Sequence, residues 1–392
     1  MSVFTGLDRV ALGDRDAVRF VEGRRIGLVA HPASVDRRLR HVTHVLREAG
    51  AELVALFGPE HGFAGQAQDM IHVEGEERRE GPVVRSLYGA TYEELSPRPE
   101  WLEGLDAVVV DLQDVGSRYY TFVWTTALVL EVAAKVGVPV VVLDRPNPLD
   151  GVHVEGAPQR PGYRSFVGLF DVAVRHGMTI GEIATMVRSL RALPEESLYV
   201  VRMQGWERSM RFEETGLPWV LPSPNMPTCD TARVYPGGCL VEGTTLSEGR
   251  GTTRPFELWG APGIDGERLA RSVPIEGAVL RPVVFQPTFH KHAGKPCGGV
   301  QVHVTDVELF RPYEAYLRLL AAALEQRPDE PKWRTETYEY VTDRLAIDLL
   351  TGGPEYREAV ESGQGLEDVI EAERQGEERF RRDREPFLLY RA

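Results

Sequence analysis

The sequence predicts a doubly wound α/β fold with a mostly parallel sheet, followed by a second, smaller α+β domain. Three apolar runs support this prediction, namely Leu53–Phe57, Ala107–Val110 and Val138–Leu143. Continuous Val, Leu and Ala runs of this length are typical of strands that are buried on both faces, as in a parallel sheet. A dense polar cluster follows each run, and ligands of open parallel sheets bind beyond the carboxyl ends of the strands. The pattern therefore indicates an enzyme whose site lies at one edge of the sheet.

Other segments of the first half complete an alternation of strands and helices. The further expected strands are Arg25–Ala30, Val83–Tyr88 and Leu198–Met203, and the expected helices cover about 36–49, 122–136 and 180–192. Thr179 and Glu182 have the spacing of a capping box, in which two side chains satisfy the first backbone N–H groups of a helix. This order of elements favours right-handed crossovers and a doubly wound sheet.

Four prolines from Pro218 to Pro227 interrupt the alternation of strands and helices. We therefore expect a first domain over 1–226 and a second domain over 227–392. In the second half the expected strands are Val279–Phe285 and Gly299–Val304, the expected helix is Tyr313–Glu325, and the charged segment 367–384 is typical of a helix with a solvated face. This less regular pattern indicates the smaller α+β domain.

The composition of the 392 residues limits the classes of partner. The net charge of -14 disfavours nucleic acid, because neutralising phosphates requires clustered Lys and Arg. Since no apolar run reaches the ~18 residues of a membrane span, we expect no membrane contact. The first residues lack the features of a signal peptide, which predicts a cytoplasmic protein, with export of a longer precursor as the alternative. Neither a P-loop nor a GxGxxG after a strand occurs, so we expect no cofactor.

The first polar cluster, Gly58-Pro59-Glu60-His61-Gly62, makes Glu60 a candidate general acid. Glycines on both sides permit an unusual bend and the close approach of a ligand. A carboxyl group above the sheet can act as an acid if partial burial raises its pKa. The structural alternative is a carboxylate that braces the loop by accepting backbone N–H bonds.

The second cluster contains Asp111, Gln113, Asp114, Arg118 and Tyr119. The planar guanidinium of Arg118 suits a carboxylate ligand. The alternative is an ion pair in which Arg118 neutralises a buried Asp at the end of the strand.

Three further loops present candidate site residues. A stretch stiffened by two prolines presents Arg145 and Asn147, for which a structural turn and a ligand contact are equal alternatives. A proline-rich connector presents Asn225, and a Gly-containing loop of the second half presents Glu248 and Arg250. That loop lacks the Gly-Lys-Ser/Thr ending of a phosphate-binding loop.

A metal site at the carboxyl ends of the strands is an alternative interpretation of the same residues. The side chains that could converge there as a mixed nitrogen and oxygen site are His31, His61, Asp111, Asp114 and Asp144. The chain has neither HExxH nor a closely spaced pair of histidines that fits the usual ligand spacing, and we therefore predict no metal.

Several motifs in order carry a resemblance to one family. They are Phe57–Gly62, Ser86–Gly89, Asp111–Gly116, Arg118–Thr121, Leu143–Pro148, Ser165–Gly168, Gly177–Glu182, Pro222–Pro227 and Ser247–Thr253. Together they resemble the exo-β-N-acetylmuramidases of peptidoglycan recycling, from about residue 27 to beyond 306. The resemblance implies a Rossmann-like first domain, a cleft site between two domains, and removal of terminal N-acetylmuramic acid from the non-reducing end of peptidoglycan fragments.

The resemblance also implies roles for the candidate residues. Glu60 is expected as the catalytic acid, and Glu248, Asp114 or the substrate's own 2-acetamido oxygen as the second catalytic group. Arg118, Arg145 or Arg250 would bind the lactyl carboxylate of muramic acid. The residues expected to bind the saccharide are His31, His61, Tyr88, Asp111, Gln113, Arg118, Tyr119, Arg145, Asn147, Asn225 and Arg250. A metal-dependent hydrolase and a non-catalytic saccharide-binding protein are the alternative functions.

Overall fold

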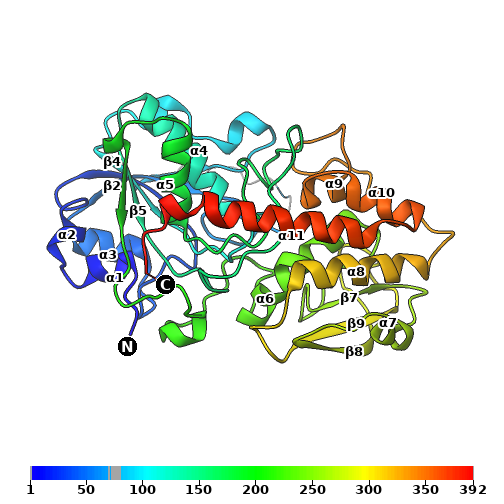
Figure 1. Cartoon of the computed structure of the whole chain (residues 1–392). Coiled ribbons are helices and arrows are strands. Elements are labelled where there is room, and N and C mark those ends of the chain that lie inside the picture. Colours follow the sequence, from blue (N-terminus) through cyan, green and yellow to red (C-terminus); the bar gives the residue numbers. More distant parts are fainter. Residues whose placement is uncertain (1, 69–70, 72–80, 392) are drawn as a thin grey trace.

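Two sheets, one parallel and one antiparallel, divide the molecule into two lobes (Figure 1). The structure is a computed structural model that describes residues 2–68, 71 and 81–391. In this described part the parallel sheet has six strands in the order β3-β2-β1-β4-β5-β6, with β1 Arg25–Ala30, β2 Glu52–Gly58, β3 Val83–Ser86, β4 Ala107–Asp111, β5 Val140–Leu143 and β6 Leu198–Val201. This order is that of the Rossmann-like, doubly wound fold, which confirms the predicted fold class.

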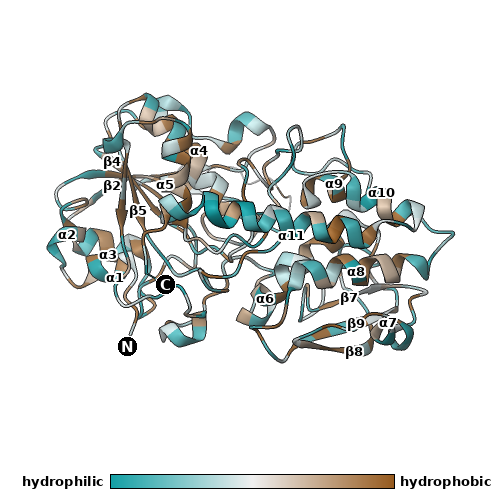
Figure 2. Cartoon of the chain, in the orientation of Figure 1, coloured by the Kyte–Doolittle hydropathy of each residue, from teal (hydrophilic) through white to brown (hydrophobic). Residues whose placement is uncertain are grey.

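Helices cover both faces of the parallel sheet, because successive strand residues point to opposite sides. Val109 and Val141 pack with α1 (Gly6–Ala11), α2 (Arg15–Val18) and α3 (Val42–Glu48). The residues that alternate with these valines pack instead with helices α4 (Phe122–Lys135) and α5 (Ile180–Leu190). Figure 2 shows the apolar residues concentrated in the strands between the helix layers.

The predicted capping box opens α5 as expected. The hydroxyl of Thr179 accepts a hydrogen bond of 3.2 Å from the backbone N–H of Glu182, and the Glu182 carboxylate accepts one of 3.0 Å from the N–H of Thr179. Two orphan donors at the start of the helix are thereby satisfied.

The second lobe combines a small antiparallel sheet with six helices in the described residues. Its strands are β7 Leu258–Ala261, β8 Ala278–Phe285 and β9 Cys297–Val304, and its helices are α6 Cys229–Gly238, α7 Gly266–Ser272, α8 Pro312–Glu325, α9 Ala346–Thr351, α10 Glu355–Ser362 and α11 Leu366–Asp383. The two predicted strands and the predicted helix α8 are present. Among the described residues, no helix has both the length and the apolar character needed to cross a membrane.

Helix α11 joins the two lobes, running from the second lobe to the first (Figure 1). Its charged outer face is exposed as predicted, but its inner face is not solvated. The carboxylates of Glu373 and Glu377 accept hydrogen bonds of 2.6 and 2.9 Å from backbone N–H groups of the first lobe. Beyond the helix, the hydroxyl of Tyr390 donates a 2.5 Å hydrogen bond to Asp144 at the end of β5.

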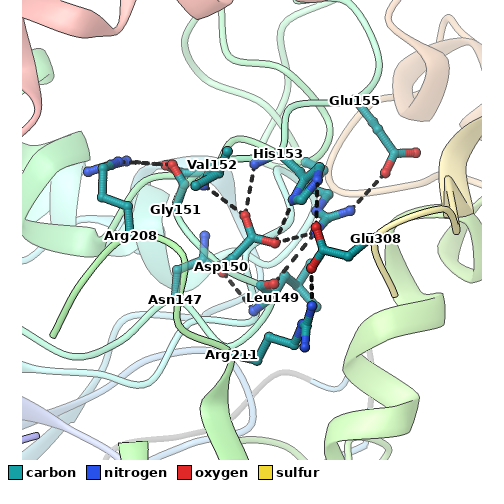
Figure 3. A network of polar contacts seen from close by, with 12 residues as sticks. Asn147, Leu149, Asp150, Gly151, Val152, His153, Glu155, Arg208, Arg211 and Glu308 are labelled. Atoms are coloured by element: carbon teal, nitrogen blue, oxygen red, sulfur yellow. Dashed lines mark hydrogen bonds and ion pairs between the residues drawn. The ribbon is translucent and has the colours of Figure 1, made fainter. Parts of the chain in front are cut away.

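A network of ion pairs also bridges the lobes (Figure 3). Asp150 accepts hydrogen bonds of 2.7 Å from Arg175 and 2.9 Å from His153. Glu308 of the second lobe pairs with Arg211, and one of its oxygens lies 3.7 Å from His153 Nε2. The lobes are therefore held together by charge complementarity as well as by α11.

Candidate active site

A pocket lies between the two lobes. The first lobe contributes Glu60, His61, Tyr119, Tyr120, Thr121, Val167, Ser223, Asn225 and Met226 to its lining. The second lobe contributes Tyr235, Glu242, Arg250, Phe256, Tyr338 and Glu339. Five of the residues singled out from the sequence thus share one pocket, namely Glu60, His61, Tyr119, Asn225 and Arg250.

A sharp bend after β2 places Glu60 in this pocket. His61 adopts a left-handed backbone with φ of 70°, a conformation that costs a non-glycine residue on the order of 1–2 kcal/mol. Gly58 is required for a local reason, since a Cβ atom there would lie 2.3 Å from the backbone nitrogen of Phe63. The Glu60 side chain is 7% exposed, and its Oε2 accepts a hydrogen bond of 2.6 Å from the hydroxyl of Thr121.

His61 is held beside Glu60 as a neutral imidazole. Its Nδ1 lies 2.9 Å from the carbonyl oxygen of Ala67 and donates to it. Burial lowers the pKa of His61, and the guanidinium of Arg250 acts in the same direction. The ring therefore contributes a polar but uncharged surface to the pocket at neutral pH.

Arg250 and Glu242 form the polar wall from the second lobe. Arg250 Nη2 donates a 2.6 Å hydrogen bond to Glu242 Oε1, and the hydroxyl of Tyr338 donates one of 2.9 Å to Glu242 Oε2. Both carboxylate oxygens of Glu242 are thus engaged. This arrangement fixes the guanidinium at the pocket surface.

Glu248 lies behind Arg250 and is fully buried, outside the lining of the pocket. Its carboxylate is 3.0 Å from the Lys291 ammonium, 2.9 Å from His290 Nδ1 and 3.3 Å from Arg250 Nε. Burial alone would raise the pKa of Glu248, but Lys291, His290 and Arg250 together hold it far below its usual value. Glu248 is therefore a permanent anion at neutral pH, and it helps to orient Arg250.

A tight turn in the second lobe carries Glu339 to the pocket. Backbone hydrogen bonds of 2.9 and 3.2 Å close the turn between Tyr338 and the residue three positions on. Its two central residues, Glu339 and Tyr340, have φ values of 46° and 66°, which normally favour Asn and Gly. The hydroxyl of Tyr88 lies 3.3 Å from each Glu339 oxygen, and the hydroxyl of Tyr340 donates a 2.9 Å hydrogen bond to the Gly89 carbonyl. Two strained residues thus dock the turn on the first lobe.

Aromatic rings form the remaining walls. The rings of Tyr119 and Tyr120 contact Tyr235 edge-to-face, with centroid distances of 6.4 and 6.0 Å, and Tyr235 contacts Phe256 at 4.9 Å. Sugar rings present C–H groups on their faces, and aromatic walls supply apolar area for them. The lining thus combines carboxylates, a guanidinium and aromatic rings, which are the kinds of side chain that contact sugars.

Three predicted site residues, Asp111, Arg118 and Arg145, lie outside the lining of this pocket. The ion pair considered for Asp111 is present, but its partner is Arg145, with contacts of 2.5 Å at Nε and 2.9 Å at Nη2. Arg118 donates instead to three backbone carbonyls, one of them that of Leu350 in α9 at 2.7 Å. Both guanidiniums therefore hold the protein together.

His31 and Gln113 occupy the crevice between β1 and β4, where the strand order reverses and doubly wound folds usually bind ligands. His31 Nδ1 donates to the carbonyl oxygen of Pro222 at 3.1 Å, and Nε2 accepts from the backbone N–H of Gln113 at 3.0 Å. Burial lowers the pKa of His31 to about 3. The amide of Gln113 donates to the carbonyls of Asp114 and Pro146. Hydrogen bonds within the protein thus occupy His31 and the Gln113 amide, but Gln113 and Arg145 also line a second pocket in this part of the molecule.

The other candidates are also placed away from the lining. Asp114 accepts a hydrogen bond of 2.7 Å from the Gly116 N–H, and Asn147 donates one of 3.0 Å to the Met178 carbonyl. Tyr88 is not part of the lining, but its hydroxyl contacts Glu339, which is. Within the described residues, no three His, Cys, Asp or Glu side chains are placed together to hold a metal ion. A role in substrate binding stays a prediction for His31, Tyr88, Asp111, Gln113, Arg118, Arg145 and Asn147, and a role as the second catalytic group stays a prediction for Asp114 and Glu248.

Sequence reasoning missed Glu242, Tyr338 and Glu339 as pocket residues. Glu242 lies eight positions before Arg250, and that short distance was a usable signal for an ion pair. No comparable signal precedes Glu339, since its place depends on a turn that docks on a segment 251 residues away.

Comparisons with known proteins agree over nearly the whole chain. Residues 26–230 match the family model described as exo-β-N-acetylmuramidase NamZ, N-terminal, and residues 233–390 match its C-terminal counterpart. The peptidoglycan β-N-acetylmuramidase NamZ of Bacillus subtilis (strain 168) is 40% identical, covering 99% of this chain and 91% of that protein.

Two crystal structures of DUF1343 family proteins from Bacteroides fragilis NCTC 9343 are similar in fold. One has a TM-score of 0.86 and 32% identity and covers 99% of each chain. The other has a TM-score of 0.77 and 27% identity and covers 100% of this chain and 99% of its own.

Proposed function

Because the chain belongs to the exo-β-N-acetylmuramidase NamZ family, we infer that it is an exo-acting glycoside hydrolase that acts on peptidoglycan fragments. It releases terminal N-acetylmuramic acid from their non-reducing end. The observation that carries the assignment of the site is the position of Glu60, whose carboxyl group is buried in a pocket with aromatic walls between the lobes.

We propose Glu60 as the general acid. The hydroxyl of Thr121 donates to Oε2, so the transferable proton belongs on Oε1. As the bond between the anomeric carbon and the bridging oxygen breaks, its electron pair passes to that oxygen, which takes the proton from Glu60. The positive charge that develops on the sugar ring is stabilised by the carboxylate that this transfer leaves behind. The oxygen of a water molecule forms the new bond to the anomeric carbon, and the proton that this water loses restores Glu60 to its acid form.

We propose Arg250 as the residue that binds the lactyl carboxylate. Of the three arginines considered for this role, Arg250 lines the pocket that contains Glu60, whereas Arg118 and Arg145 lie outside that lining. Glu242 and Glu248 hold its guanidinium from two sides. The ion pairs of Glu248 support a positioning role for it rather than a direct role as the second catalytic group.

The assignment is tested by incubating the protein with a disaccharide of N-acetylmuramic acid and N-acetylglucosamine and identifying the products. We expect free N-acetylmuramic acid from the wild type and a loss of rate on the order of 10²-fold or more in Glu60→Gln. Glu52→Gln is the matched control, since Glu52 is exposed at the start of the same strand. An intact disaccharide would overturn the proposal.

The two alternative functions give different results in the same assay. A metal-dependent hydrolase would lose activity in chelator and regain it when metal is returned. A non-catalytic saccharide-binding protein would bind the disaccharide without turnover, and Glu60→Gln would keep its affinity.

A further inference from the structure

Glu339 is a buried carboxylate that the second lobe contributes to a pocket whose proposed acid comes from the first lobe. We propose that Glu339 is a specificity-determining residue, which accepts hydrogen bonds from the hydroxyl groups of the terminal sugar. This inference rests on the proposed function of the pocket. It assigns to the second lobe a direct part in recognising the substrate.

The pairing of two neighbouring strands places Glu339 near Glu60. Gly58 at the end of β2 pairs with Ser86 at the end of β3, and Glu60 and Tyr88 each follow two residues later. Since the strands are parallel and in register, both side chains leave the sheet at the same edge. Glu339 contacts the hydroxyl of Tyr88, which brings its carboxylate to the side of the pocket where Glu60 lies.

The electrostatic surroundings of Tyr340 agree with this placement. Burial raises the pKa of its phenol, and the negative charges of Glu339 and Glu60 raise it further. Tyr340 is therefore within electrostatic reach of both carboxylates. Its hydroxyl anchors the turn on Gly89, so the position of Glu339 is set by contacts with the first lobe.

The three carboxylates of the lining have different surroundings. Glu242 holds Arg250 and Tyr338 through its two oxygens, which makes it a brace. Glu60 is the proposed acid. Glu339 lines the pocket next to the Tyr88 hydroxyl, and a carboxylate can accept several hydrogen bonds at once, which are stronger than those to a neutral acceptor. It is therefore suited to substrate hydroxyls in addition to its contacts within the protein.

The strained turn supports a functional role for this residue. Two consecutive left-handed residues that are neither Gly nor Asn persist where the surrounding contacts impose them, and such strain gathers at functional sites. A glycine at either position would relax the turn, but it would remove Glu339 from the pocket or the Tyr340 anchor from Gly89.

The test compares Glu339→Gln with wild type in two measurements, namely steady-state kinetics on the disaccharide and calorimetric binding of free N-acetylmuramic acid. We expect KM and the dissociation constant each to rise on the order of tenfold or more, with kcat changed by no more than about threefold. Glu336→Gln is the matched control, because Glu336 is 75% exposed in the same segment. Glu339→Asp, which keeps the charge but shortens its reach, is expected to weaken binding as well, and it serves as the test if the Gln variant fails to fold.

An unchanged dissociation constant in a folded variant would overturn the inference. So would a loss of kcat with unchanged affinity and the loss of one limb of the pH profile, since that result would make Glu339 part of the chemical step. If the wild type cleaves the disaccharide and Glu339→Gln binds N-acetylmuramic acid as tightly as the wild type, the inference about Glu339 is wrong but the proposed function stands. A wild type that neither binds nor cleaves the saccharide removes the proposed function together with it.

Discussion

The hydroxyl of Thr121 donates a hydrogen bond of 2.6 Å to Oε2 of Glu60. Thr121 is the residue immediately before α4, and Glu60 lies in the bend after β2. The contact therefore connects two loops at the edge of the sheet and fixes the rotamer of the proposed acid. Because the acid must reach the bridging oxygen to within hydrogen-bond distance, its orientation matters for the rate.

Thr121→Val replaces this hydroxyl with a methyl group of similar size. We expect kcat to fall on the order of tenfold, because a carboxyl group that is no longer held samples unproductive rotamers. Thr121→Ser keeps the hydroxyl and should retain most of the wild-type kcat. Equal rates in the two variants would show that the contact does not orient Glu60.

Arg250→Lys keeps a positive charge but loses the planar fork. We expect KM for a muramic acid saccharide to rise on the order of tenfold, since a single ammonium replaces a bidentate contact. An analogue whose lactyl carboxylate is converted to an amide is the control, and its KM should be the same for both proteins. If both substrates are affected equally, Arg250 does not recognise the carboxylate.

Arg145→Met is expected to reduce stability strongly. Asp111 is 0% exposed, and loss of its partner leaves a buried negative charge without compensation, at a cost of about 3–5 kcal/mol in the free energy of unfolding. The double variant Asp111→Asn/Arg145→Met should recover part of this loss. Urea denaturation of the single and double variants measures both effects, and a stable single variant would contradict the ion-pair interpretation.

His31 makes stability depend on pH at the acidic side of neutrality. Its folded pKa of about 3 lies below the ordinary value of 6.5, so the unfolded chain takes up a proton that the folded chain does not. Stability from this residue is present above pH 6.5 and is lost as the pH falls toward 3. Between about pH 7 and pH 5 the loss is about 2 kcal/mol.

The comparison that isolates this contribution uses His31→Asn, which keeps a donor for the Pro222 carbonyl but does not titrate in this range. The free energy of unfolding of the variant should fall less steeply with acid than that of the wild type. The slope is the quantity compared, so a general loss of stability in the variant does not obscure the result. Parallel slopes would refute the assignment.

The strands and the bend that carries Glu60 could be predicted from the sequence, because the patterns that indicate them are local. A run of valines predicts a buried strand from hydrophobicity alone, and β1 extends over the residues expected, Arg25–Ala30. The bend at Glu60 is likewise encoded within five residues. Helix α6 was missed because Pro236 and two glycines interrupt its pattern, although packing against α8 stabilises it.

The ion-pair partners of the charged residues were harder to predict from the sequence, since they depend on side-chain geometry. Asp111 was expected to pair with an arginine, and it does so with Arg145 of the next strand end rather than with Arg118, which is nearer in sequence. The site was expected beyond the carboxyl ends of the strands. The pocket between the lobes contains Glu60 from the bend after β2, whereas His31 is bonded to Pro222, and Gln113 and Arg145 line a separate pocket.

The segment after α11 ends on the first lobe, where Arg384 donates to the His176 carbonyl and Tyr390 to Asp144. The polypeptide therefore passes between the lobes twice, once near 227 and once near 384, so that the second lobe is topologically an insertion. Two connecting segments allow the lobes less relative motion than a single connecting segment would. These two covalent connections therefore limit how far the lobes can separate at the pocket that lies between them.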